Sequence, residues 1–167
     1  MAESAVIETL EHLAGKYLTF ILAEESYGME ILKVQEIIGL MPITRVPRTP
    51  TFVRGVINLR GKVIPVVELR RKFEMDSIDD TEKSCIIVVQ IEQPDGSLIM
   101  GLLVDEVSEV LDVAGVNIEP PPNFGMQVDN EFILGIGKQD NNVIMLLNVD
   151  KLLATNELEV VHQIEET

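Results

Sequence analysis

The amino-acid sequence contains two related copies of one segment, and this repeat limits the fold more than any other feature. Residues 52–73 align with residues 132–153, without a gap, when the chain is shifted by 80 positions. The identical positions are Phe52 and Phe132, Gly55 and Gly135, Val63 and Val143, and Ile64 and Ile144. Apolar residues also meet apolar residues along the alignment, so we expect the two segments to form the same elements.

A second segment repeats upstream, where residues 28–38 match residues 101–111 at a shift of 73 positions. The larger shift downstream gives the second copy a loop that is seven residues longer. A repeat of this length is too long for a solenoid unit and indicates two related halves. Each half has fewer than ~80 residues, a size at which one hydrophobic core is marginal, so we expect the halves to pack together.

Several classes of protein are disfavoured by composition. Cys85 is the only cysteine, so the chain cannot form an internal disulfide or a thiolate metal cluster. The N-terminus lacks a basic start before an apolar run, and no window approaches ~18 uninterrupted apolar residues, so neither a signal peptide nor a membrane span is expected. A net charge of −15 disfavours binding to nucleic acid or anionic lipid. We therefore expect a cytoplasmic protein.

The charge is unevenly distributed along the chain. Nine of the 13 basic residues lie between positions 33 and 72 with only two acidic residues, so this stretch carries +7 and the rest carries −22. Such a basic band on an acidic body suggests a surface for docking protein partners, including copies of the same chain. Alternatively, Arg70, Arg71 and Lys72 form one solvated helical turn.

Short apolar runs separated by turn residues predict a mainly β fold. Residues 17–22, 27–31, 55–59, 62–69, 84–91 and 98–107 read as strands, and a final hairpin covers 132–149. The apolar run of residues 31–38 fits a helical turn as well as a strand. Three prolines between positions 42 and 50 exclude a regular helix there. We expect two five-stranded, barrel-like halves side by side, with short helices at the ends and connections.

An inventory of reactive residues gives little support for catalysis. His12 and His162 are the only histidines, they lie near opposite ends of the chain, and neither belongs to a metal-binding motif. The chain has no G-x-S-x-G elbow and no phosphate-binding glycine motif. Cys85 lies in an apolar run, where a core thiol is expected rather than a nucleophile. No enzyme activity, metal or cofactor is therefore predicted.

The two copies differ most at one hairpin turn. The first copy reads Asn58-Leu59-Arg60-Gly61-Lys62, whereas residues 138–142 of the second form a generic polar turn. Because one kind of turn is enough for folding, the special one is a candidate binding site. Arginine followed by glycine at a turn presents a planar set of donors on a backbone that accepts positive φ. Alternatively, Arg60 binds a carbonyl group of its own turn.

Two further features are candidates for binding. Val34, Glu36 and Ile37 combine two apolar groups with a carboxylate, and their counterparts Val107, Glu109 and Val110 show that part of this pattern is structural. Phe124 follows three prolines in the longer loop, where it either packs back on the core or projects as an anchor for a partner.

These motifs resemble those of a known family. The run RGVINLRGKVIPVVELRRKF at 54–73, preceded by YGMEILKVQEI at 27–37, is similar to the CheW-type coupling proteins of bacterial chemotaxis. The resemblance extends from about residue 16 to residue 154. It implies one domain made of two SH3-like five-stranded barrels, approximately 16–80 and 81–154, with exchange of strands between them left open. Residues 1–15 would form a helix or flexible segment, and 155–167 an acidic tail.

The resemblance also implies a function. Members of the family are adaptors without catalytic activity that hold a CheA-type histidine kinase against the cytoplasmic tips of chemoreceptors. By this resemblance, the groove between the barrels would carry the receptor and kinase contacts, and the hairpin tip would present the arginine. The residues so assigned are Val34, Glu36, Ile37, Asn58, Arg60 and Gly61.

Larger assemblies and rival functions also follow from the comparison with this family. Phe124 would lie at a kinase-facing or ring-forming surface, and rings would form with copies of the chain or with the similar regulatory domain of the kinase. One rival is an isolated kinase regulatory domain, against which the Met1 start and the absence of an ATP-binding motif argue. The other is a small β-barrel enzyme or ligand-binding protein, for which the histidine inventory leaves little chemistry.

Overall fold

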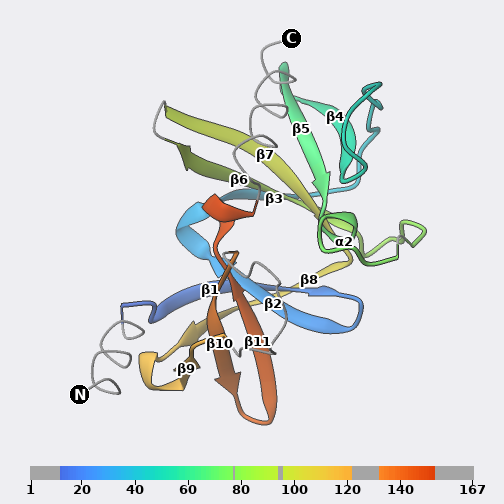
Figure 1. Cartoon of the computed structure of the whole chain (residues 1–167). Helices are drawn as coiled ribbons and strands as arrows, with labels where there is room; N and C mark the ends of the chain where they lie inside the picture. The colour runs from blue at the N-terminus through green and yellow to red at the C-terminus, as the bar shows by residue number, and fades with distance from the viewer. Residues whose placement is uncertain (1–11, 77, 94–95, 122–131, 153–167) are drawn as a thin grey trace.

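The structure is a computed structural model that describes residues 12–76, 78–93, 96–121 and 132–152. Most of the expected N-terminal segment 1–15 and all of the expected acidic tail 155–167 lie outside the described residues. Figure 1 shows two groups of strands, one above the other, with the chain crossing between them. The fold is mainly β, as the sequence predicts, and the two groups of strands are the two barrels.

Two sheets contain the strands of the described residues. The five-stranded sheet has the order β3 (Val34–Gly39), β6 (Cys85–Gln93), β7 (Gly96–Val104), β5 (Lys62–Glu68), β4 (Val53–Leu59). The six-stranded sheet has the order β8 (Glu106–Val113), β1 (Gly15–Leu22), β2 (Glu25–Glu30), β11 (Asn142–Leu147), β10 (Ile133–Gln139), β9 (Ile118–Glu119). Short helical turns connect some of the strands: η1 (Ile31–Lys33), α2 (Leu69–Lys72) and η2 (Gly115–Asn117). Another, η3 (Val149–Lys151), follows β11.

The two sheets share one layout, which is the structural form of the sequence repeat. In each, a hairpin pairs through its second strand with the parallel strand of another hairpin: β7 pairs with β5, and β2 pairs with β11. The repeat partners Gly28 and Gly101 occupy matching places in these parallel pairs, opposite Leu146 and Val66. The repeat therefore predicts the equivalence of the halves correctly.

Sheet membership does not follow the expected division between residues 80 and 81. The five-stranded sheet is made from residues 34–104, whereas the six-stranded sheet combines residues 15–30 with 106–147. The first hairpin is thus exchanged into the barrel formed by the second copy, as Figure 1 shows for β1 and β2 beside β10 and β11. The chain crosses between the barrels only at η1 and at Asp105, among the residues that the structure describes.

The sixth strand is a small addition to the expected five. β9 has two residues and pairs with β10 through Glu119 and Ile136. The other barrel has a single bridge at the equivalent place, between Thr44 and Val56, and their backbone groups exchange hydrogen bonds of 2.8 Å in both directions. Each barrel is therefore closed by the same kind of short contact, made against β4 in the first barrel and against β10 in the second.

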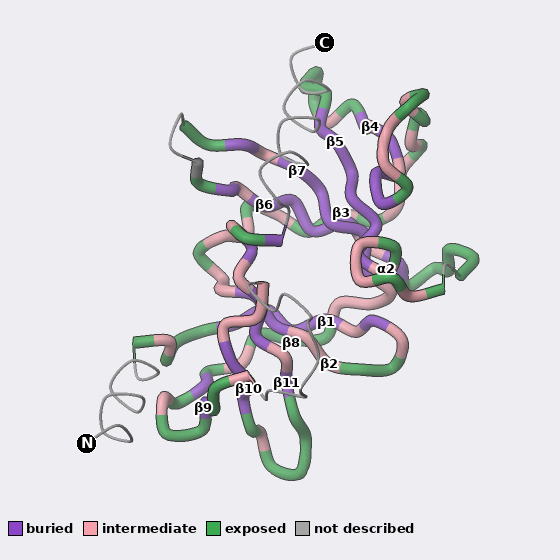
Figure 2. The backbone as a smooth tube through the Cα atoms, viewed as in Figure 1, coloured by how far each residue is buried: buried purple, intermediate pink, exposed green. Residues whose placement is uncertain are grey.

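Three clusters of apolar side chains form the interior. One fills the five-stranded barrel around Ile57, Val66 and Val88, and a smaller one fills the other barrel around Tyr17 and Leu146. The third and largest lies between the barrels, with contributions from both sheets that include Phe20, Leu22, Met29, Val67, Leu69, Val89, Met100, Leu102 and Leu147. Figure 2 shows this burial along the strands that face one another. The shared core explains how two small halves are stable together.

Four aromatic rings extend this shared core toward the surface. Phe20 stacks on Tyr27 and Tyr27 on Phe73, with ring centroids 5.9 Å apart in each pair. Phe73 in turn stacks on Phe132 at 5.1 Å. Because Phe20 and Tyr27 come from the first hairpin, Phe73 from the end of α2 and Phe132 from the second copy, the stack joins the exchanged hairpin to both barrels.

The run at residues 31–38, which fits two kinds of structure by sequence, contains both. Residues 31–33 form the 3₁₀ turn η1, and the strand β3 begins at Val34. The hairpin predicted around Arg60 and Gly61 and the helical turn after it are confirmed as β4, β5 and α2. In the described part of the chain, no helix is long and apolar enough to cross a membrane.

Candidate functional site

Arg60 and Glu36 are brought together at the surface of the five-stranded barrel. Glu36 lies on β3 and Arg60 lies at the tip between β4 and β5, so the two residues come from opposite edges of the sheet. Arg60 Nη1 donates to Glu36 Oε2 at 3.2 Å, and Arg60 Nη2 donates to Glu36 Oε1. The paired contact matches the planar guanidinium to the planar carboxylate and fixes the direction of the arginine.

The pair favours the charged form of both groups. Hydrogen bonds from Arg60 lower the pKa of Glu36, and the same hydrogen bonds raise the pKa of Arg60. The Arg60 side chain is 70% exposed and that of Glu36 is 30% exposed. Because a guanidinium has five N–H donors and Glu36 receives two of these bonds, the remaining donors can reach a partner.

The backbone at the tip holds Arg60 in a conformation that few residues adopt. Arg60 has φ 54° and Gly61 has φ 88°, the signs that a two-residue hairpin turn requires. The Asn58 side-chain oxygen accepts a hydrogen bond of 2.8 Å from the Gly61 N–H. Both side-chain hydrogen bonds that the structure gives Arg60 go to Glu36, so the alternative of a bond to a carbonyl of its own turn is not observed.

The equivalent turn in the second barrel shows that folding does not require an arginine. Asp140 occupies the position of Arg60 and has the same φ of 54°. The repeat counterpart of Glu36 is Glu109, whose backbone N–H donates to the Thr19 hydroxyl at 3.1 Å and whose C=O accepts from the same hydroxyl at 2.7 Å. The second barrel therefore has the same backbone but two acidic side chains where the first has an ion pair.

Apolar side chains lie close to the ion pair along the sequence. Ile37 follows Glu36 on β3 and is 43% exposed, while Val34 is half-buried against the central core. Val63 is the second residue of β5, just after the tip, and is 39% exposed. It is absent from the set predicted by sequence. No sequence signal identifies Val63 as exposed. In the structure its counterpart Val143 is 53% exposed, and Val110, the counterpart of Ile37, is 48% exposed. Each barrel thus presents two aliphatic side chains at matching positions.

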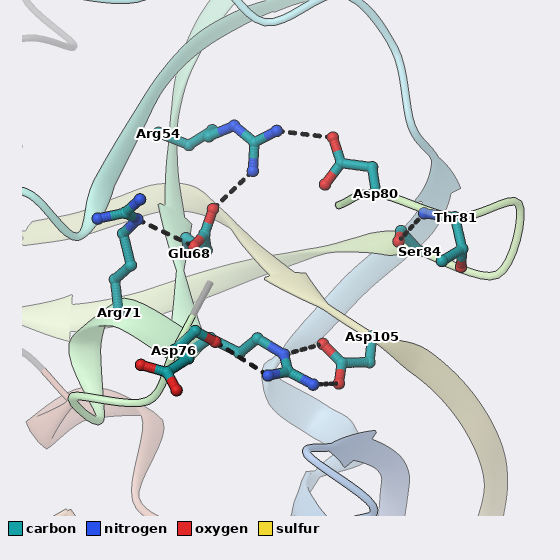
Figure 3. A network of polar contacts seen from close by, with 9 residues as sticks. Arg54, Glu68, Arg71, Asp76, Asp80, Thr81, Ser84 and Asp105 are labelled. Atoms are coloured by element: carbon teal, nitrogen blue, oxygen red, sulfur yellow. Dashed lines mark hydrogen bonds and ion pairs between the residues drawn. The ribbon is translucent and has the colours of Figure 1, made fainter. Parts of the chain in front are cut away.

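Much of the basic band ties the molecule together instead of facing solvent. Figure 3 shows Arg54 between Glu68 and Asp80, with Arg71 on the other side of Glu68. Arg70 donates to Asp105 at 2.7 and 2.5 Å, and Asp105 also accepts the Ala23 N–H at 2.9 Å. Since the Arg70 side chain is only 13% exposed, the interpretation of a fully solvated turn is wrong for this residue.

A pseudo-equivalent contact lies at the other crossing between the barrels. Lys33 of η1 donates to Asp150 Oδ2 at 2.8 Å, and Asp150 Oδ1 accepts the Glu92 N–H at 3.0 Å. Asp150 is the repeat counterpart of Arg70, so the two crossings are held by ion pairs of reversed polarity. These contacts, with the shared core, fix the position of β3 and hence of Glu36.

The other sequence candidates do not form a reactive centre in the described residues. Phe124 lies outside them. No group of His, Cys, Asp and Glu side chains in the described ranges is arranged to hold a metal ion. Cys85 is half-buried, and its thiol donates to the Lys83 carbonyl at 3.3 Å. The arrangement places exposed charge and aliphatic groups together on one barrel.

Comparisons with known proteins agree with this picture. The profile of the CheW-like domain matches residues 16–157. The chain is 36% identical over 165 residues to "Chemotaxis protein CheW" of Klebsiella aerogenes, covering 96% of this chain and 97% of the relative. It is 33% identical over 138 residues to the protein of the same name from Helicobacter pylori, covering 83% and 81% of the two chains.

A solved structure shows the same fold. The crystal structure of the scaffolding protein TtCheW from Thermoanaerobacter tengcongensis superimposes with a TM-score of 0.75 at 39% sequence identity. The match covers 86% of this chain and 95% of that chain. With two barrels, a shared core and a family match across most of its length, the chain belongs to the CheW-like domain family.

Proposed function

We propose that this protein is a non-catalytic adaptor that couples chemoreceptors to a CheA-type histidine kinase. Membership of the CheW-like family supports an adaptor role in chemotaxis, and neither an enzyme nor a small-ligand protein is favoured by these relatives. The observation that carries the proposal to a particular surface is the exposed Arg60–Glu36 pair. The second barrel has Asp140 at the position of Arg60, and the ion pair of its turn joins Lys138 to Glu119 instead.

The surface of the five-stranded barrel around Arg60 and Glu36 is the proposed site of receptor and kinase contacts. It differs from the expected groove between the barrels, because the Arg60 tip lies at the end of β4 and β5 away from the core that the barrels share. Glu36, Ile37 and Arg60 would contact a partner, Val34 would link the strand to the central core, and Asn58 and Gly61 would hold the tip. Exposed aliphatic groups beside an oriented arginine suit a protein interface, because such interfaces combine an apolar centre with arginine at high frequency. The ion pair between Arg60 and Glu36 and the exposure of Ile37 support this placement.

Coupling without chemistry requires two contacts on one rigid body. If the receptor and the kinase bind different parts of the surface, a change in the receptor that alters one contact must alter the affinity for the other partner. The shared core and the two ion pairs at the crossings make the barrels suitable for this role, because they hold the surface of one barrel in a defined position relative to the other.

Rings are the second part of the proposal. The first barrel presents Ile37 and Val63 beside a neutral ion pair, and the second presents Val110 and Val143 beside acidic groups. A contact between unlike faces of neighbouring subunits closes into a ring when the rotation allows it. We infer that copies of the chain, or the kinase regulatory domain, join in this way, with Phe124 at the kinase-facing or ring-forming surface. The protein would act in the cytoplasm, recruited to receptor arrays at the inner membrane.

Calorimetry with a purified CheA-type kinase tests the assignment of the surface. We expect Arg60→Asp, which copies the second barrel, to weaken binding by about tenfold or more, as for an oriented arginine at an interface. Lys16→Asp is the matched control, since Lys16 forms an exposed ion pair with Asp112 on the other barrel at 3.1 Å. Equal binding of wild type and Arg60→Asp, with both folded by circular dichroism, would rule out Arg60 as a contact.

A further inference from the structure

A second recognition feature lies at the opposite end of the β4–β5 hairpin from Arg60. A hollow of about 440 Å³ is bordered there by Arg45, Arg54, Glu68, Arg71, Ile78 and Asp80, among others. A neighbouring hollow of about 370 Å³ is lined by Leu40, Met41, Pro42, Ile43, Arg54 and Asp80. The two hollows share Ile43, Arg54 and Asp80, so the Arg54–Asp80 contact stands between them.

Arg54 is held from two sides. Its Nη1 donates to Glu68 Oε1 at 2.6 Å and its Nη2 donates to Asp80 Oδ2 at 2.6 Å, as Figure 3 shows. The Glu68 side chain is 6% exposed and also pairs with Arg71 at 3.2 Å. Asp80 is 34% exposed and comes from the connection between the copies. One side of Arg54 therefore faces a buried fixed carboxylate, and the other faces a replaceable one.

The side chains that line the larger hollow carry a net positive charge if the segment joining the two copies, which contributes Asp79 and Asp80, is left out. Arg45, Arg54 and Arg71 supply three positive charges, and Glu68 supplies one negative charge. Asp79 and Asp80 of the connection then neutralise what remains. Arg45 is exposed and forms no ion pair with any residue that the structure describes. The Asp80 carboxylate thus occupies the position in which a carboxylate of another molecule would bind the Arg54 guanidinium.

The second half shows that the barrel does not require this arrangement. A hollow of about 380 Å³ lies at the corresponding place, where Leu134 replaces Arg54 and Asn148 replaces Glu68. The backbone is the same in both halves, since the Glu68 N–H binds the Phe52 carbonyl and the Asn148 N–H binds the Phe132 carbonyl, each at 2.7 Å. The arginine and its buried carboxylate are therefore additions to one copy, as Arg60 is at the other end of the hairpin.

We propose that the two joined hollows bind an extended acidic segment of a partner protein, and that residues 78–80 occupy the site in its absence. A carboxylate of the partner replaces Asp80 and accepts the hydrogen bond from Nη2 of Arg54, while Nη1 stays bound to Glu68. An adjacent apolar side chain of the partner lies against Leu40, Met41 and Ile43. The proposal concerns a different part of the barrel from the Arg60 surface and does not depend on the function proposed above.

The test uses the full chain and a defined probe. The probe is a fluorescein-labelled peptide of four glutamates flanked by leucines, and its glutamine analogue is the neutral control. Fluorescence anisotropy should show that Asp80→Ala binds the acidic probe up to about fivefold more tightly than wild type, because an exposed ion pair of this kind no longer competes. Asp112→Ala removes a carboxylate from an exposed ion pair on the other barrel and should leave binding unchanged.

Three results would overturn the proposal. An equal gain in Asp112→Ala would mean that only net charge matters. Absence of binding to Asp80→Ala, or equal binding of the glutamine probe, would mean that Arg54 does not accept an external carboxylate. Arg45→Gln added to Asp80→Ala should weaken binding again, and no loss in this double variant would place the probe elsewhere on the molecule.

Discussion

Replacing Gly55 by alanine should break the bridge between Thr44 and Val56 that closes the five-stranded barrel. A Cβ atom on Gly55 would lie 2.2 Å from the Thr44 carbonyl oxygen and 2.8 Å from its carbonyl carbon. Both are backbone atoms, which cannot rotate away as a side chain does. Gly55 also has φ 150°, a conformation that L side chains rarely adopt. The alanine would therefore be strained both by its own backbone and by its neighbour.

The magnitude follows from the contacts that would be lost. Backbone strain at such a position costs roughly 1–3 kcal/mol. Moving Thr44 away would break its two hydrogen bonds with Val56, each of 2.8 Å, at roughly 1 kcal/mol apiece. We expect a loss of about 3–5 kcal/mol, a large share of the roughly 5–15 kcal/mol by which small domains are stable.

Urea unfolding followed by circular dichroism measures this loss. Gly135→Ala is the matched variant in the second barrel, where the nearest backbone atom, the Glu119 carbonyl oxygen, would be 2.9 Å from the new Cβ. Gly39→Ala is the control, because a Cβ there meets nothing within 4 Å. The free energy of unfolding should fall most for Gly55→Ala, less for Gly135→Ala, and within about 0.5 kcal/mol of wild type for Gly39→Ala. Equal stability of Gly55→Ala and Gly39→Ala would refute the close approach of the Thr44 backbone to Gly55 and the bridge between Thr44 and Val56.

Two other predictions concern pH. Burial raises the pKa of Asp105. Hydrogen bonds from Arg70 and the Ala23 N–H lower this pKa by more than burial raises it, so the pKa of Asp105 lies below its ordinary value. A carboxyl whose pKa is depressed on folding stabilises the protein above its unfolded pKa, and this contribution is lost as the pH falls below about 4. Asp105→Asn should therefore cost about 1–3 kcal/mol in urea at pH 7, and a difference that persists undiminished at low pH would contradict the ion pair. Burial raises the pKa of Tyr17 to about 12 and also raises that of Tyr27. Ultraviolet titration of the native protein should therefore show Tyr17 ionising near 12, and a Tyr17 midpoint near 10 would contradict its burial.

The repeat predicts the equivalence of the two barrels but not the exchange of the first hairpin. Matching of Gly28 with Gly101 and of Gly55 with Gly135 identifies corresponding positions, because a Cβ atom would meet packed side chains at the first pair and a neighbouring backbone at the second. Which copy supplies a given hairpin to a given barrel depends on long-range pairing, here β2 with β11 and β5 with β7. Local sequence patterns contain no information on these partners, so the division at residues 80 and 81 differs from the division between the sheets.

The candidate surface was accessible to sequence reasoning because the copies differ there. Comparison of Arg60 with the turn at 138–142 points to the tip, and the structure places Glu36 within reach of Arg60 from the other edge of the sheet. Val63 was missed because an aliphatic residue at the start of a strand reads as core, and only the exposed fraction shows otherwise. The sequence does not predict that Arg54 pairs with both Glu68 and Asp80, because Asp80 lies 26 positions away in a connection with the composition of a solvated linker.

The most direct test of the adaptor role is the rate of kinase autophosphorylation in the presence of chemoreceptors. A CheA-type kinase, receptor-containing membranes and this protein should together give receptor-dependent activation. Arg60→Asp should abolish most of the activation, and Lys16→Asp should retain it. Activation of the kinase by receptors to the same extent with wild type, with Arg60→Asp and without the protein would contradict the proposed coupling.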